Sequence, residues 1–268
     1  PESLQPLAWR GDAGLSLVER GPYGVVAAIT PVTNPTSTLI NNSISILSAG
    51  NAVVFNAHPG AKNVCTYQIQ LINRAIIAAG GPANLVTTVM EPTIETAQAL
   101  MKHPGVRMLL VTGGPGVVQE AMRSGKRAVC AGPGNPPVVV DETADIDKAG
   151  RDITFGGGFD NNVICTDEKE IFVVDTVADK LKAAMCAHGA VEVPSHKLRA
   201  LEKVIFKEMG KPRKPGVTNK QWVGKYACDI LAEIGIPAGK EVRLALVEVP
   251  LEHPLVWTEQ LMPVMPLV

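Results

Sequence analysis

The sequence lacks the features of a membrane or secreted protein. Its apolar runs, such as Val25–Ile29, are far shorter than the roughly 20 residues that a membrane span needs, and no secretory signal is visible. Its cysteines are odd in number, five, and form no C-x-x-C pair. This argues against a disulfide framework and for a reducing compartment, so we expect a cytoplasmic protein.

An excess of charge of one sign is also missing. The formal net charge is -1, with Lys and Arg scattered along the chain, which excludes the electrostatic footprint of a nucleic-acid-binding or membrane-surface protein. The five histidines have no metal-ligand spacing, so no metal site is predicted. There is no G-x-S-x-G motif of a serine hydrolase either. We expect a small-molecule partner.

With 268 residues, 46% of them hydrophobic and 19% charged, the chain can bury a core and is long enough for two domains. In the first half, short apolar runs alternate with helical patterns, which predicts a doubly wound, mainly parallel α/β sheet. The expected strands are 25–29, 52–55, 85–89, 108–111 and 128–130. The expected helices are 35–47, 61–79, 94–101 and 117–122.

The Gly- and Pro-rich segment Gly134–Pro137 marks a domain boundary, and we divide the chain into residues 1–136 and 137–268. In the second half we expect strands at 138–140, 171–174 and 244–249, and helices at 145–155, 177–187, 196–209 and 221–234. The chain opens with Pro1 and stops at Val268, inside an apparent strand. We therefore expect that segments are missing at both ends.

Two Gly-containing turns follow expected strands and precede expected helices. They are Thr112–Gly116 and His58–Gly60. Backbone N–H groups and the helix dipole at such turns bind phosphate. The first turn does not match G-x-G-x-x-G, so a tight turn without a ligand remains an alternative at this point.

Cys165 follows the segment Phe159–Ile164, and a cysteine can act as a nucleophile only as an accessible thiolate. The alternative is a small buried hydrophobic residue, which is the default for all five cysteines. Asn34 precedes Pro35 at an expected helix start. Its side chain either caps the helix or donates to a reacting carbonyl oxygen.

Taken together, these segments resemble the aldehyde dehydrogenase superfamily. The resemblance rests on Ile29–Pro35, Val54–Lys62, Val111–Gly116, Ala131–Pro137, the segment ending at Cys165 and Thr258–Val264, in the family's order. More narrowly, the chain is similar to the coenzyme A-acylating propionaldehyde and acetaldehyde dehydrogenases of bacterial microcompartments. The resemblance implies an incomplete Rossmann-type domain that binds NAD and coenzyme A, followed by an α/β catalytic domain.

The resemblance also implies roles for individual residues. Cys165 aligns with the nucleophile that attacks the aldehyde, and Asn34 with the amide that holds the oxyanion together with the N–H of the nucleophile. The residues that fall where the family lines its cofactor site are Thr30, Pro31, His58, Pro59, Gly60, Gly81, Thr112, Gly113, Gly114, Val117 and Glu259, of which Glu259 would hold the nicotinamide ribose.

One departure bears directly on the reaction. Acid-forming relatives carry a Glu at the start of the segment that here begins at Cys130, and that Glu activates water. No acidic residue occurs from Lys126 to Val140. Losing a general base slows hydrolysis by a factor of about 100 to 10,000, which leaves the thioester for a thiol such as coenzyme A. Cys130 itself has no assigned role.

The predicted function is therefore oxidation of propionaldehyde or acetaldehyde with NAD and transfer of the acyl group to coenzyme A. The alternatives are an acid-forming aldehyde dehydrogenase and an inactive fragment that keeps the fold. Asn56 stands where many relatives have a Lys that reaches the adenosine ribose, which leaves NAD against NADP open. From the relatives we expect a homo-oligomer at full length, residence in a microcompartment, and contacts with its shell or core enzymes.

Overall fold

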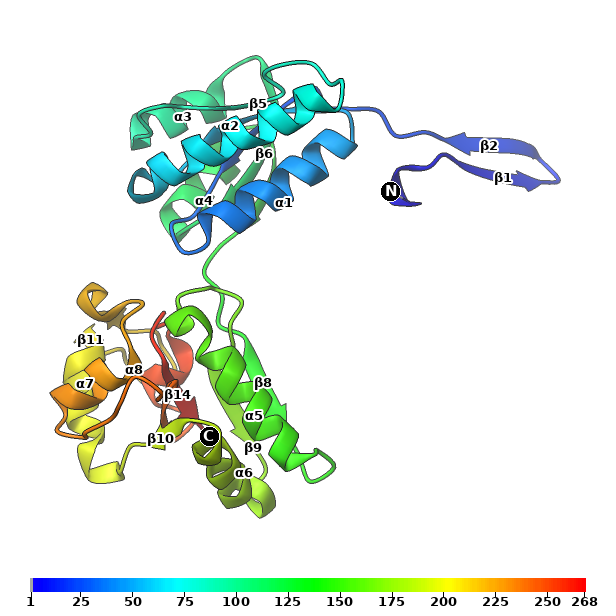
Figure 1. Cartoon of the computed structure of the whole chain (residues 1–268). Helices are drawn as coiled ribbons and strands as arrows, with labels where there is room; N and C mark the ends of the chain where they lie inside the picture. The colour runs from blue at the N-terminus through cyan, green and yellow to red at the C-terminus, as the bar shows by residue number, and fades with distance from the viewer. Residues whose placement is uncertain (1) are drawn as a thin grey trace. The chain divides into compact units, whose positions relative to one another are not determined.

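Two parallel β-sheets organise the chain in the computed structural model, which describes residues 2–268. They belong to two units that divide between Pro133 and Gly134, just before the boundary expected after Pro136. Figure 1 labels the helices and strands of both units. Among the described residues, no helix is both long enough and apolar enough to cross a bilayer.

The sheet of the N-terminal unit has five parallel strands in the order β5-β4-β3-β6-β7. The strand order reverses direction beside β3, and ligands bind at such a switch point in open α/β sheets. The strands are β3 (Val25–Ile29), β4 (Ala52–Asn56), β5 (Val86–Thr88), β6 (Val106–Thr112) and β7 (Arg127–Ala131). All five lie on the runs that the sequence analysis predicted.

Helices cover both faces of this sheet, because β3 is apolar on both sides (Figure 1). Val26 and Ala28 pack toward α1 (Pro35–Ser48) and α2 (Lys62–Ala78). Ala27 and Ile29 pack toward α3 (Ile94–Lys102) and α4 (Pro115–Arg123). The predicted doubly wound α/β architecture is confirmed.

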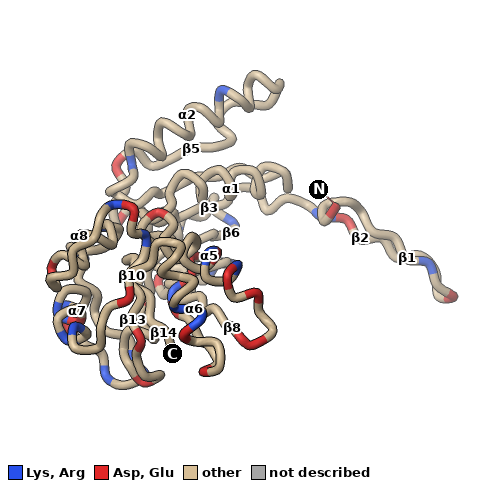
Figure 2. Tube along the Cα trace, turned by 60° about the horizontal axis from the view of Figure 1, so that its bottom comes forward, with Lys and Arg blue, Asp and Glu red and all other residues tan. Residues whose placement is uncertain are grey.

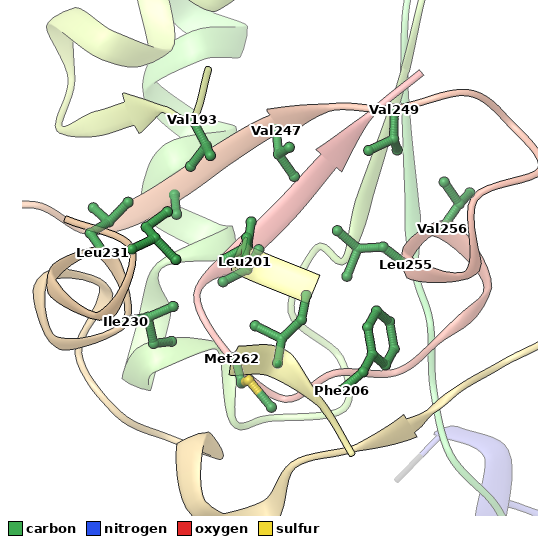
Figure 3. Packing of buried hydrophobic residues seen from close by; sticks show 14 residues of the cluster. Val193, Leu201, Phe206, Ile230, Leu231, Val247, Val249, Leu255, Val256 and Met262 are labelled. Atoms are coloured by element: carbon green, nitrogen blue, oxygen red, sulfur yellow. The ribbon is translucent and has the colours of Figure 1, made fainter. Parts of the chain in front are cut away.

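The C-terminal unit repeats this layering around a second parallel sheet, with the order β10-β13-β14-β9-β8. Its strands are β8 (Pro137–Val140), β9 (Glu170–Val173), β10 (Ala190–Glu192), β13 (Leu244–Glu248) and β14 (Val264–Leu267). Helices α5 (Ile146–Gly157) and α6 (Asp175–Ala187) cover one face. Helices α7 (Leu198–Ile205) and α8 (Ala227–Glu233) cover the other, where Leu201, Ile230 and Met262 meet in the core shown in Figure 3.

Several elements differ from the sequence expectation. Helix α7 ends at Ile205, not near 209, because β11 (Phe206–Glu208) pairs with β12 (Val217–Thr218). The helix expected over 221–234 is a short 3₁₀ turn, Lys220–Trp222, followed by α8. The sequence analysis also missed β10 and the hairpin of β1 (Leu7–Gly11) and β2 (Gly14–Val18), whose residues are all exposed. Strand β14 lies where the chain was expected to end inside a strand.

Charged side chains of both signs are interspersed over the elements of the C-terminal unit, whereas α1 carries none (Figure 2). Residues of one charge sign do not gather on any part of the C-terminal unit in this view. This agrees with the scattered Lys and Arg of the sequence, and with a small-molecule partner.

Candidate active site

A cavity of about 710 Å³ opens in the N-terminal unit where β3, β4 and β6 end. Eight of the predicted cofactor residues line it: Thr30, Pro31, His58, Pro59, Thr112, Gly113, Gly114 and Val117. Sequence reasoning assigned no role in the cavity to further lining residues from α3 and α4, among them Ala97, Gln98, Met101, Gln119 and Glu120. In the sequence these residues belong to ordinary amphipathic helix patterns, which give no sign of a binding site.

The N-terminus of α4 is open toward this cavity. Its N-cap, Gly114, offers no side chain, whereas α3 is closed by a capping box between Thr93 and Thr96. At Gly113 a Cβ would lie 2.7 Å from Val117 Cγ1, so the close turn requires glycine. Free N–H groups at a helix N-terminus bind anions, so this turn fits the phosphates of a nucleotide.

His58 is held in one orientation by its own turn. Its Nδ1 accepts from Gly60 N at 3.1 Å, which leaves Nε2 as the protonated nitrogen. Gly60 and Gly81 do not line the cavity. Gly81 instead closes the end of α2, where an added Cβ would meet Ile76 Cγ2 at 2.7 Å.

Among the described residues that line the cavity, one is acidic and none is Lys or Arg. The acid is Glu120, which accepts from Gln98 at 3.1 Å. Asn56 is 4% exposed, and its Oδ1 accepts from Thr96 Oγ1 at 2.9 Å. Within residues 2–268, β4 therefore ends on an amide, where a carboxylate would select a ribose 2′-hydroxyl against a phosphate.

Asn34 does not cap α1, although it is the N-cap residue. Its Oδ1 accepts from Thr33 Oγ1 at 3.0 Å. Within residues 2–268 its amide nitrogen has no hydrogen-bond partner, and the side chain is only half-buried. The capping alternative of the sequence analysis is therefore wrong, and the amide N–H groups are free to donate to a ligand.

The segment before Cys165 has an unusual backbone. Asp160, Asn161 and Asn162 have φ of 45°, 54° and 59°, a left-handed conformation that is costly for residues other than glycine. Buried Asn162 maintains it by donating to Gly157 O at 2.7 Å and to a second backbone carbonyl. Such strain persists only where the surroundings over-determine the backbone.

Cys165 differs from the other cysteines in its surroundings. It is partly exposed, whereas Cys65 and Cys228 are buried. Burial raises the pKa of the Cys65 and Cys130 thiols, which disfavours their thiolates. Cys186 is exposed near the end of α6. Access excludes Cys65 and Cys228 but not Cys130 or Cys186. The position of Cys165 after a left-handed backbone segment marks it as the candidate nucleophile.

The backbone beside Cys165 is fixed by Asp167. Its Oδ2 accepts from Ile164 N at 3.3 Å, and its own N–H donates to Ile164 O at 3.2 Å. The N–H of Cys165 itself has no partner within residues 2–268. A free N–H on the nucleophile can stabilise an oxyanion that forms there.

Within residues 2–268, some ionisable side chains of this region besides the buried Asp167 are also half-buried or more. Glu259 accepts from Gly134 N at 3.1 Å, and burial raises its pKa. Burial also raises the pKa of Glu170 to about 7, and one of its oxygens has no partner within residues 2–268. Lys169 is fully buried. The sequence analysis missed Lys169 and Glu170, because nothing in their spacing distinguishes them from surface charges.

Gly134 brings a second segment against the nucleophile. A Cβ there would lie 2.3 Å from the carbonyl oxygen of Cys165. We expect Gly134→Ala to push the two segments apart, with a loss of about 1–3 kcal/mol in the free energy of unfolding and an altered alkylation rate of Cys165 by iodoacetamide. Gly132→Ala is the matched control, because nothing lies within 4 Å of its Cβ position. Equal effects of both substitutions would contradict the steric argument.

Comparison with known proteins places these features in a family context. Residues 4–194 match the model of the aldehyde dehydrogenase family. The whole chain is 50% identical to an acetylating acetaldehyde dehydrogenase of Escherichia coli K12, over 57% of that protein's length. It therefore spans a little over half of this relative.

Solved structures give the same picture. The whole chain superposes with a TM-score of 0.91, at 47% identity, on 60% of a propionaldehyde dehydrogenase chain from Rhodopseudomonas palustris, described with bound coenzyme A and an acylated cysteine. The TM-score is also 0.91, at 42% identity and over 60% of that chain, for a propionaldehyde dehydrogenase from a fucose-utilisation microcompartment of Clostridium phytofermentans.

Proposed function

Because the chain belongs to the aldehyde dehydrogenase family, we propose that it oxidises a short aldehyde on Cys165 and passes the acyl group to coenzyme A. The observation that carries this proposal is the combination of a partly exposed Cys165 with a free backbone N–H at the end of a strained segment. The relatives described as coenzyme A-acylating or acetylating support the choice of acceptor.

In this mechanism, the residues of the chain hold the reacting groups. Cys165 attacks the aldehyde carbonyl, and its own N–H stabilises the oxyanion. The amide of Asn34 is proposed as a second donor from the family resemblance alone. The turn of Gly113 and Gly114 at α4 would hold a dinucleotide phosphate, and from the family resemblance Glu259 would hold a ribose. The dinucleotide, which we propose to be NAD, would supply the hydride acceptor. A thioacyl group then remains on Cys165.

The acceptor of the acyl group follows from what Cys165 lacks. Within residues 2–268, no hydrogen bond joins its thiol to a carboxylate or an imidazole. The carboxylates of Glu259 and Asp167 already accept from backbone N–H groups. Without a base to activate water, the thioester favours attack by a thiol, since a thiolate needs less activation than water does.

The test is nicotinamide reduction with propionaldehyde or acetaldehyde, with NAD or NADP, in the presence and absence of coenzyme A. It is made on the 268-residue chain and on the chain extended by the flanking segments of a full-length relative. We expect turnover that requires coenzyme A and yields an acyl-CoA. Fast release of the free acid without the thiol would instead establish the acid-forming alternative. Silence of both proteins would support the inactive fold.

For the setting of this reaction, we propose the bacterial cytoplasm and, within it, a microcompartment. The Clostridium phytofermentans relative comes from such a compartment, which supports this location. We also propose a homo-oligomer at full length and contacts with shell or core enzymes. Sedimentation of the extended protein, and its co-purification with shell proteins, test these two points.

A further inference from the structure

Lys169 stands out as a buried cation directly beside the nucleophile. Its side chain is fully buried, one residue before β9 begins. Within residues 2–268, no carboxylate lies within salt-bridge distance of its Nζ. Taking an ammonium out of water costs several kcal/mol unless it is well compensated. Burying Lys169 therefore lowers the stability of the fold relative to an apolar side chain at the same position.

The three donors of this ammonium all go to the segment that precedes Cys165. Nζ donates to Asn162 O at 2.8 Å, to Asn162 Oδ1 at 2.5 Å and to Ile164 O at 2.9 Å. Asn162 is the last of the three residues with left-handed backbone. The contacts thus converge on a strained segment and on the peptide unit that ends at the nucleophile.

The contact with Ile164 has a direct consequence for Cys165. The carbonyl of Ile164 and the N–H of Cys165 belong to one planar trans peptide, so they point in opposite directions. The carbonyl also accepts from Asp167 N at 3.2 Å, and a cation added to it holds the plane further and keeps the N–H pointed away from the buried side. It also polarises the peptide, which strengthens the N–H as a donor.

We propose that Lys169 is a positioning residue that orients the Ile164–Cys165 peptide, so that the N–H of Cys165 serves as the oxyanion donor. Lys169 touches neither substrate nor thiol in this role and acts through the Ile164 carbonyl. The proposal rests on the proposed function of Cys165 as an acyl-accepting nucleophile.

The electrostatic surroundings agree with a cation retained for this purpose. Burial lowers the pKa of Lys169 to about 8, and the negative charges that oppose this shift belong to Asp167, Glu259, Cys165 and Glu170. Near neutral pH the side chain is therefore mostly protonated, with all three donors available to the two carbonyls and the amide oxygen.

The experiment compares two reactions of the same thiol. Acylation of Cys165 by p-nitrophenyl propionate passes through a tetrahedral oxyanion and depends on the N–H donor, whereas alkylation by iodoacetamide forms none. For Lys169→Met we expect acylation to fall by about 10- to 100-fold, with the alkylation rate little changed. A ratio of acylation rate to alkylation rate equal to that of the wild type would overturn the proposal, whether both rates are unchanged or both fall equally.

Two further variants guard the interpretation. Lys169→Gln keeps two N–H donors without the charge, and it replaces Lys169→Met in the test if that variant does not fold. We expect a smaller fall in the ratio of acylation to alkylation. An unchanged ratio counts against the proposal. Glu170→Gln is the matched control, because it removes a neighbouring buried ionisable group but leaves the bonds to Ile164 intact. Its ratio should equal that of the wild type, and a fall like that of Lys169→Met would show a general effect of buried charge.

This test is independent of the overall reaction. Neither p-nitrophenyl propionate nor iodoacetamide requires a nucleotide or coenzyme A. Failure of coenzyme A-dependent turnover would therefore count against the proposed function alone. Failure of the ratio to change would count against the role of Lys169 alone.

Discussion

Replacing Cys165 by serine is expected to abolish the formation of an acyl-enzyme and to reduce coenzyme A-dependent turnover by about three orders of magnitude or more. A serine hydroxyl is not ionised near neutral pH without a base, and no imidazole or carboxylate is hydrogen-bonded at this position within residues 2–268. A thiol, with an ordinary pKa of about 8.5, ionises partly without help. The loss should therefore be chemical, not structural.

The measurements follow from that distinction. Mass spectrometry after incubation with propionyl-CoA detects the acyl group on the intact chain, and nicotinamide reduction gives the turnover. Nucleotide binding, measured by calorimetry, should be unchanged, because the candidate phosphate site lies in the N-terminal unit and Cys165 in the C-terminal unit. Cys186→Ser, at an exposed cysteine, is the control. Acylation retained in Cys165→Ser would move the nucleophile elsewhere, with Cys130 as the next candidate.

The fold could be predicted where one pattern decided the structure. The uninterrupted apolar run Val25–Ile29 is a strand buried on both faces, and the predicted bounds agree with those of β3. The hairpin β1–β2 was missed although Leu15–Leu17 alternates apolar and polar residues; in the structure all residues of both strands are exposed. Strand β14 contains Pro266, and a proline normally argues against a central strand. In the structure β14 is nevertheless paired on both sides.

For helix α7 the sequence predicted too much regular structure of one kind, because the helix was expected to be longer than it is. Phe206 continues the apolar period of Leu201 and Ile205, so the sequence predicts a longer helix. In the structure Phe206 begins β11 and pairs with Thr218. The pairing partner is distant in sequence, and local periodicity carries no information about it.

The candidate site was likewise predictable from the sequence only in part. The glycine turn at Gly113 was visible, because turn residues between a strand and a helix have a local signature. The contact of Lys169 with the Ile164 carbonyl was not, because a lysine in a charged run such as Asp167–Glu170 normally indicates a solvated surface. For Asn34 the sequence left two roles open, and only the hydrogen bonds of its side chain distinguish them.

Asn34→Ala is expected to raise the barrier of acyl transfer by roughly 2.7–4 kcal/mol, about 100- to 1,000-fold in kcat, if its amide is an oxyanion donor. The free energy of unfolding should change little, because the side chain caps no N–H of α1. A true N-cap would lose about 1 kcal/mol. Kinetics of nicotinamide reduction and a urea unfolding curve measure the two quantities on the same preparation.

Asn34→Asp is the sharper variant, because it keeps the shape and the acceptor for Thr33 Oγ1 but removes the free N–H donors. It should be at least as slow as the alanine variant, since a carboxylate also repels a developing oxyanion. A normal rate in both variants would mean that the N–H of Cys165 stabilises the oxyanion without Asn34. In that case the bond from Thr33 would only hold an amide that takes no part in the chemistry, and the positioning of Cys165 through Lys169 would account for the whole of the oxyanion stabilisation.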